Sequence, residues 1–229
     1  MERENIELAE GRYADGLSEL EPVIGNDGGP DRAEAIVNAA FVVLGDFGLE
    51  GLTVRAVLKQ AGLNRRSFYE HFLGKDDLVL AVFARSVSRA AENCRQQISA
   101  MSNPMEQLKA VVLQLAIGDS PFPENQSQSL RRGAALCREH MRLAEARPAD
   151  LVLALKPLLA LFSELLAAGV EQGQVRDYSP QRLAALVYNL MSTSVHAELL
   201  AEEAGAGDPA RRQALAEEIW EFCRRAIAA

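Results

Sequence analysis

The chain has 229 residues, 48% of them hydrophobic, and a formal net charge of −8 at pH 7. This length allows one or two domains with a sizeable core. No uncharged apolar run reaches the roughly 18 residues of a membrane span, so none is predicted. The first ten residues, MERENIELAE, lack the apolar region of a secretion signal, and we therefore expect a cytoplasmic protein.

Residues 1–30 form an acidic extension, with eight acidic residues against two basic ones. A chain segment that binds in a groove of DNA is typically basic, so this acidic extension is not expected to enter one. Its apolar residues recur near helical spacing, which predicts an additional docked helix. They are Ile6, Ala9, Tyr13, Leu17 and Leu20.

The next segment predicts a helix that begins at Asp31, with Glu34 as its capping-box partner. One face of this helix is apolar and should support the elements that follow. That face consists of Ile36, Val37, Ala40, Phe41 and Leu44.

Residues 52–78 read LTVRAVLKQAGLNRRSFYEHFLGKDDL and predict two short helices joined by a tight turn. Thr53 suits the N-cap of the first helix, and Gly62 suits the left-handed conformation that ends it. Asn64 suits the N-cap of the second helix, where Leu63 and Phe68 have the spacing of a hydrophobic staple. Phe68 and Phe72 should face inward, while the remaining side chains of this helix point elsewhere.

The same stretch is locally basic in an acidic chain. Between Thr53 and Lys75 there are five basic residues and one acid, Glu70. Two short helices around a glycine turn, with basic residues on the second, are typical of a unit that enters the DNA major groove. A positive patch of this kind neutralises phosphates.

These residues resemble the N-terminal domain of the TetR (tetracycline-repressor-like) family of bacterial transcription regulators. The resemblance rests on four features over residues 31–80: Phe41, Gly45, Phe47-Gly48 and Thr53 at their spacing; AGLN at 61–64; S-F-Y-x-H-F at 67–72; and K-x-x-L at 75–78. The rest of the chain is similar to the family in architecture only.

The resemblance implies which residues bind DNA. Thr53, Tyr69 and Lys75 match positions that hold phosphates, and residues 64–67 match the base-reading positions. The chain departs from the family at Arg66, where a small residue or proline is common, and at Ala56, where an acid is common. The expected DNA-binding residues are Thr53, Arg55, Asn64, Arg65, Arg66, Ser67, Tyr69, Glu70, His71 and Lys75.

Several of these roles have alternatives. Arg65 and Arg66 each suit a bidentate contact to guanine, or a contact to phosphate alone. Glu70 either accepts from a cytosine amine or lies on the helix surface near Arg66. His71 either packs between helices or contacts a phosphate. It is not predicted to bind a metal, because no second ligand lies at the spacing of a metal site.

The remainder predicts helices and no strands. The expected helices span 75–101, 104–117, 127–146, 148–173, 180–203 and 208–228, and Pro157 should kink the fourth of these or mark its start. The fold class is therefore all-α, with an extension (1–30), a three-helix helix-turn-helix DNA-binding domain (31–77) and a larger helical regulatory and dimerisation domain (78–229).

The last two helices carry apolar stripes that either fill the core of the chain or, as the resemblance implies, join a second copy in a four-helix bundle. A two-fold dimer would place two reading helices about 34–36 Å apart on a palindromic operator. The expected interface consists of Leu183, Leu186, Val187, Leu190, Ser194, Leu215, Ile219 and Phe222.

The resemblance also implies a small-molecule pocket in the helical body, with an apolar or aromatic effector. Each candidate residue has ordinary core packing or surface exposure as its alternative. The candidates are Phe122, His140, Met141, Phe162, Tyr188, Met191 and His196.

The function that follows is a sequence-specific DNA-binding regulator, a repressor released from its operator by a ligand. The alternatives are an activator, or a regulator that answers to a protein partner without a ligand. An enzyme is not expected, because Glu-x-x-His, His-Glu-x-x-His, Cys-x-x-Cys and a glycine-rich phosphate loop are absent from the sequence. No cofactor or metal is predicted, and the separated Cys94, Cys137 and Cys223 fit reduced thiols better than a redox sensor.

Overall fold

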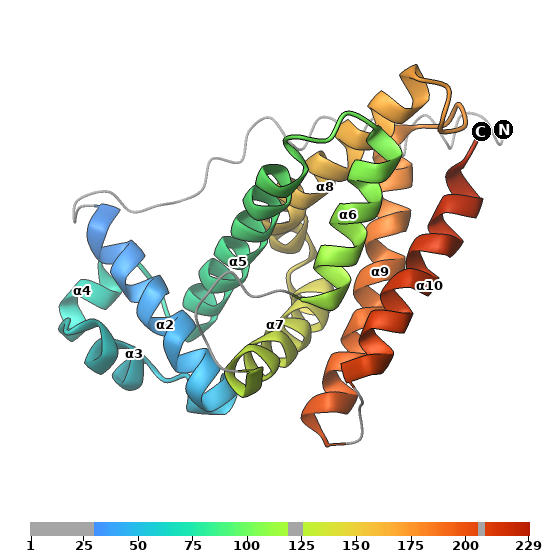
Figure 1. The fold of residues 1–229 in the computed structure, drawn as a ribbon. Helices are drawn as coiled ribbons and strands as arrows, with labels where there is room; N and C mark the ends of the chain where they lie inside the picture. Colours follow the sequence, from blue (N-terminus) through green and yellow to red (C-terminus); the bar gives the residue numbers. More distant parts are fainter. Residues whose placement is uncertain (1–29, 119–125, 206–208) are drawn as a thin grey trace, which may run out of the picture.

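The computed structural model describes residues 30–118, 126–205 and 209–229, and its regular elements there are all helices (Figure 1). The all-α prediction is thus confirmed. The predicted helix in residues 1–30 and the candidate Phe122 lie outside the described residues. The helices are α2 (Pro30–Gly51), α3 (Val54–Ala61), α4 (Arg65–Tyr69), α5 (Lys75–Ile98), α6 (Pro104–Ile117), α7 (Gln126–Ala146), α8 (Pro148–Glu171), α9 (Pro180–Glu203) and α10 (Pro209–Ile227).

Helices α2, α3 and α4 pack together with the start of α5 around a small apolar core. Phe68 of α4 is fully buried there, as are Ile36 of α2 and Val57 of α3. The predicted inner face of α2 is confirmed, although Phe41 is only half-buried. Glu34, the predicted capping-box partner, pairs through its carboxylate with Arg85 of α5 and so ties α2 to α5.

Helix α2 is interrupted near its end at Gly48, where φ is 65° and ψ is −169°. This conformation is strained for residues with a side chain, so glycine is required for the chain to turn toward α3. This backbone conformation explains why the Phe47-Gly48 pair contains a glycine.

The larger core lies among α5 to α10 (Figure 1). Helix α8 contributes most directly, because it packs against α5, α6, α7 and α9. By length and composition α8 is apolar enough to cross a membrane. Its place at the centre of a helical bundle accounts for the same composition, since a helix buried against several neighbours is apolar on most of its surface.

The predicted ranges for the later helices are close to those observed, and α6 and α9 match at both ends. Helix α8 runs through Pro157 as one element, so this proline does not mark a helix start. The boundary predicted at residues 77 and 78 stays a prediction, because α5 contributes side chains to both apolar clusters.

The end of α10 is fastened beside the turn between α8 and α9. Val175 and Ala228 form an antiparallel bridge, in which the Arg176 amide donates to the carbonyl of Ile227 over 2.9 Å. Ile227 is itself buried. Helix α10 is thereby fixed next to α9, at one edge of the bundle (Figure 1).

We predict that Phe68→Ala lowers the free energy of unfolding by about 3–5 kcal/mol, because it removes a fully buried ring from the small N-terminal core. Denaturant unfolding followed by circular dichroism measures the change. Leu73→Ala is the matched control, since Leu73 is 92% exposed and its loss should change little. Equal destabilisation by both variants would contradict the packing described here.

Candidate nucleic-acid interface and body site

The two short helices α3 and α4 are fixed by their caps. The Thr53 hydroxyl accepts from the Ala56 amide over 3.1 Å, and the Asn64 side chain accepts from the Ser67 amide over 3.0 Å. Gly62 ends α3 in the left-handed conformation, with φ of 66°. Both predicted N-caps and the predicted C-cap are confirmed, and they set the angle between α3 and α4.

Helix α4 directs its basic side chains away from the core. Arg65 and Arg66 are exposed, and Arg66 donates from Nε to Glu70 over 2.9 Å. The surface pairing of Glu70 is thus the alternative that the structure bears out. Arg65 has no ion pair to any described residue, which leaves its guanidinium available to a ligand.

Ser67 was wrongly predicted as a base-reading residue. Its side chain is buried, with a residue exposure of 5%, and its hydroxyl donates to Asn64 Oδ1 over 3.3 Å. The oxygen of Asn64 is occupied by the cap as well. Within residues 64–67, the two arginines are therefore the long side chains directed outward.

Other predicted residues surround α4. Thr53, Arg55 and Tyr69 are exposed, and the Tyr69 ring lies edge-on to Phe68 with 5.2 Å between centroids. Lys75 is exposed and donates to the Leu49 carbonyl over 3.0 Å. His71 is half-buried near Phe72, and its Nε2 has no hydrogen-bond partner among the described residues. Packing between helices, one of the two alternatives for His71, fits this position.

Helix α7 is docked onto α2 by two arginines that the sequence reasoning missed. Arg131 donates to the Gly45 carbonyl over 3.1 Å, and Arg132 donates to the Phe41 carbonyl over 3.1 Å. The Arg132 guanidinium also lies 3.8 Å from the Phe41 ring centroid. A Cβ at Gly45 would lie 2.3 Å from Arg132 Nη2, so the glycine leaves room for this contact.

In the body, aromatic and imidazole rings from three helices converge. His140 Nδ1 of α7 lies 3.4 Å from His196 Nε2 of α9, and the two rings are perpendicular. The His140 ring lies 5.9 Å from Tyr188 of α9 and 5.9 Å from Phe83 of α5, measured between centroids. Three of the predicted pocket residues are thus brought together with Phe83, which had not been predicted.

Burial keeps these groups uncharged. It lowers the pKa of His196 to about 4, with His140 as the second cause, and it also lowers the pKa of His140. Burial raises the pKa of Tyr188 as well. At neutral pH the pair therefore consists of two neutral imidazoles, one donating and one accepting, in apolar surroundings.

The other pocket candidates have different positions. Met191 and Phe162 are buried in the main core. Met141 is 48% exposed, and its place in a pocket stays a prediction. It follows His140 directly on α7, and successive helical residues face directions about 100° apart.

The predicted dimer residues divide into two groups. Leu183, Val187 and Ile219 are buried in the core of the chain itself, so their contact with a partner stays a prediction. Leu186 and Phe222 are exposed by 62% and 64%, on α9 and α10. Leu190, Ser194 and Leu215 are half-buried.

The three thiols are buried, and this changes their chemistry. Burial raises the pKa of Cys94 and Cys223 to about 11 and that of Cys137 to about 12. The thiolate is the reactive form, so these cysteines are poor nucleophiles at neutral pH. Over the described residues, no cluster of three or more histidine, cysteine and carboxylate side chains is suited to hold a metal ion.

Comparisons with known proteins point to one family. Residues 36–82 match the family model described as bacterial regulatory proteins, tetR family. The chain is 23% identical to the fatty acid metabolism regulator protein of Bacillus subtilis (strain 168) over 152 residues, which is 65% of this chain and 73% of the relative. It is also similar to an HTH-type transcriptional regulator BetI of Rhizobium meliloti, with 25% identity over 42% of this chain and 47% of the relative.

Solved structures share the fold. A transcriptional regulator FadR from Bacillus subtilis in complex with stearoyl-CoA superposes with a TM-score of 0.63 at 18% identity, covering 83% of this chain and 96% of that one.

Proposed function

This chain belongs to the TetR family of bacterial regulatory proteins and is a DNA-binding transcription regulator; we propose that it represses transcription from a palindromic operator and is released by a small, largely apolar effector. The observation that carries the proposal is the outward face of α4, where Arg65, without an ion pair to any described residue, lies beside the exposed Tyr69. An enzyme is the less economical alternative, because the relatives are regulators.

The proposed DNA contacts follow from exposure and charge. Arg65 enters the major groove at the first turn of α4 and reads a base, where a bidentate contact to guanine discriminates by about 1–3 kcal/mol. Arg55, Tyr69, Lys75 and the Thr53 hydroxyl bind phosphates, which fix the register of the protein without reading sequence. Arg66 is paired with Glu70 and binds phosphate only.

The proposed dimer uses the outer face of α9 and α10, which lie side by side at one edge of the bundle (Figure 1). Two large apolar side chains exposed there, Leu186 and Phe222, would be covered by a second copy. A two-fold axis through this face would present two α4 helices to successive major grooves.

The proposed effector binds in the body near His140, His196 and Tyr188. Neutral imidazoles in an apolar setting suit an uncharged polar group on an otherwise apolar molecule. The acyl part of a fatty acyl thioester, an apolar chain that ends in an uncharged thioester, has this character, and the similarity to a fatty acid metabolism regulator supports that class. Because such regulators act on chromosomal DNA in bacteria, we place this protein in the cytoplasm.

The first test is selection of bound genomic fragments by the purified protein at a stated salt concentration. We expect a shared palindrome whose half-sites are one helical turn apart. Arg65→Ala should reduce the ratio of operator to scrambled-duplex affinity by about tenfold or more, while Lys156→Ala, an exposed lysine on α8, should leave it unchanged. If Arg65→Ala weakens both duplexes equally, Arg65 binds phosphate. If no shared sequence is recovered, the proposed function is wrong.

The dimer is tested by sedimentation at micromolar concentration. We expect a dimer for the unchanged protein and a monomer for Phe222→Glu, because burying the new carboxylate against a second copy is costly. Val152→Glu serves as control, since Val152 is 49% exposed on α8, away from the proposed interface. If the unchanged protein is a monomer, the proposed dimer is wrong.

The effector is tested by thermal unfolding with palmitoyl-CoA as the probe. Ligand at about 100 times its Kd should stabilise the protein by about 2.7 kcal/mol and weaken operator binding. His196→Leu keeps the volume but removes the imidazole, and should abolish both effects; Met141→Ala, at an exposed neighbouring position, should not. Undiminished binding of the probe by His196→Leu would exclude this location for the site.

A further inference from the structure

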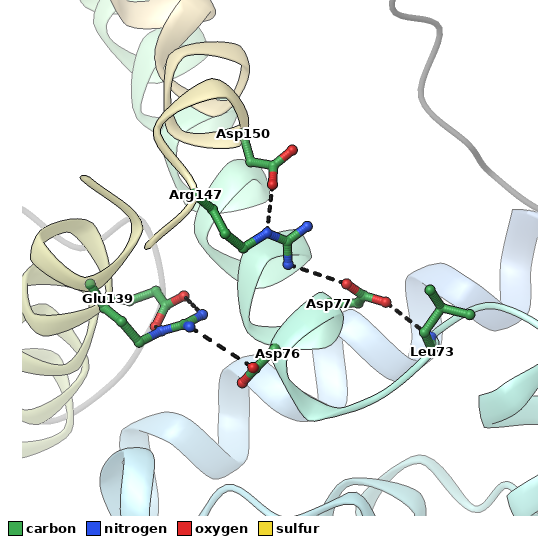
Figure 2. Close-up of polar contacts among 7 residues, drawn as sticks. Leu73, Asp76, Asp77, Glu139, Arg147 and Asp150 are labelled. Carbon is green, nitrogen blue, oxygen red and sulfur yellow. Dashed lines mark hydrogen bonds and ion pairs between the residues drawn. The ribbon is translucent and has the colours of Figure 1, made fainter. Parts of the chain in front are cut away.

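The loop between α4 and α5 is tied to the helical body through one carboxylate (Figure 2). The Leu73 amide donates to Asp77 Oδ2 over 3.1 Å. The other oxygen, Asp77 Oδ1, lies 3.3 Å from Arg147 Nη1 at the corner between α7 and α8. Arg147 is held in turn by Asp150, whose Oδ2 lies 2.5 Å from Arg147 Nε.

A second pair runs beside the first. Arg142 of α7 lies 3.9 Å from Asp76 Oδ2 and binds the buried carboxylate of Glu139 through two hydrogen bonds of 2.7 and 2.8 Å. The long distance to Asp76, whose side chain is 74% exposed, makes this contact weak. The direct link between the body and the loop is therefore the one through Asp77.

The position of Asp77 makes the link specific. Leu73 lies four residues after Tyr69, the last residue of α4, so its amide is part of the connection that sets how α4 leaves the N-terminal core. One Asp77 oxygen holds this loop and the other holds the body. The two contacts share a single side chain, so a movement of the α7–α8 corner shifts the acceptor of the Leu73 amide.

A simpler role for Asp77 is stabilisation of the N-terminus of α5 through the helix dipole. That role accounts for an acid in the first turn, but it requires neither Arg147 nor the amide of Leu73. The two roles therefore differ in what they predict for Arg147, which lies at the corner between α7 and α8 and not at the start of α5.

We propose that Asp77 and Arg147 are positioning residues for operator recognition: they hold the loop after α4 against the α7–α8 corner, without touching DNA themselves. This inference rests on the proposed function, since it assigns α4 as the recognition helix. It identifies the corner as the place where a change in the body alters the angle of α4.

Electrostatics alone makes the opposite prediction for one of the two residues. Asp77→Asn removes a negative charge near the DNA-binding face, which by charge alone strengthens binding to any duplex. Arg147→Gln removes a positive charge and by charge alone weakens it. A positioning role lowers the ratio of operator to scrambled-duplex affinity in both variants.

The test measures this ratio for Asp77→Asn, Arg147→Gln and the double variant. Each single change should lower it by about three- to tenfold, and the double variant should lose no more than the worse single one. Arg95→Gln is the matched control, because Arg95 and Glu164 form a 3.4 Å pair that also joins α5 to α8, at the far end of α5. Opposite changes that are equal on both duplexes, or additive losses, would overturn the proposal.

A second readout needs no DNA. Exchange of the Leu73 amide with water, followed by NMR, should become faster in Asp77→Asn and also in Arg147→Gln, but not in Arg95→Gln. If Arg147→Gln leaves this exchange unchanged, the link does not extend from the body to the loop and the proposal fails. If the selection recovers no operator, the proposed function fails, while the exchange rates still decide whether the link exists.

Discussion

The structure depends on how a very short helix is held. Helix α4 has five residues, and a helix of that length does not recover the cost of its own nucleation. Its conformation is imposed by the Asn64 cap, by the buried Phe68 and by the connections at its two ends. The α2–α3 pair supplies the surface for Phe68, and α5 supplies Asp77 for the loop that follows. Outward-facing arginines are useful for recognition only because these inward contacts leave them no other orientation.

The distribution of charge also favours recognition by α4. The whole chain carries a net charge of −8, yet Arg55, Lys59 and Arg65 lie exposed around α3 and α4 without an ion pair to any described residue. Many arginines of the body are engaged with carboxylates or backbone carbonyls, as Arg212 is with Glu202 over 2.8 Å. The cations around α3 and α4 attract phosphate there, while the net negative charge of the rest of the chain disfavours binding by other faces.

Local features were predictable from sequence because their causes are local. The caps at Thr53 and Asn64 and the left-handed Gly62 follow from residue chemistry and spacing, and the structure confirms them. Predictions that required a helix face to be assigned were less exact: Met141 was grouped with His140, and Leu183 with Leu186, although Met141 and Leu186 are much more exposed than their partners. On a helix buried against several neighbours, apolar residues occur on more than one side, so periodicity alone does not say which side faces outward.

Contacts between distant elements were beyond the reach of sequence reasoning. Asp77 and Arg147 are 70 residues apart, and Arg131 lies 86 residues from Gly45. Each of these charged residues had a sufficient local explanation, as a helix-terminal acid or a surface base, and nothing in the spacing indicated a partner. The structure shows instead that α7 is joined to the N-terminal unit near both of its ends: Arg131 and Arg132 contact α2, and Arg147, directly after α7, pairs with Asp77 of α5. His140 lies between these ends, so a ligand that displaced this ring would act on a helix whose two ends are already attached to the DNA-binding unit. Close packing would transmit such a displacement as a movement of the whole helix rather than absorb it locally.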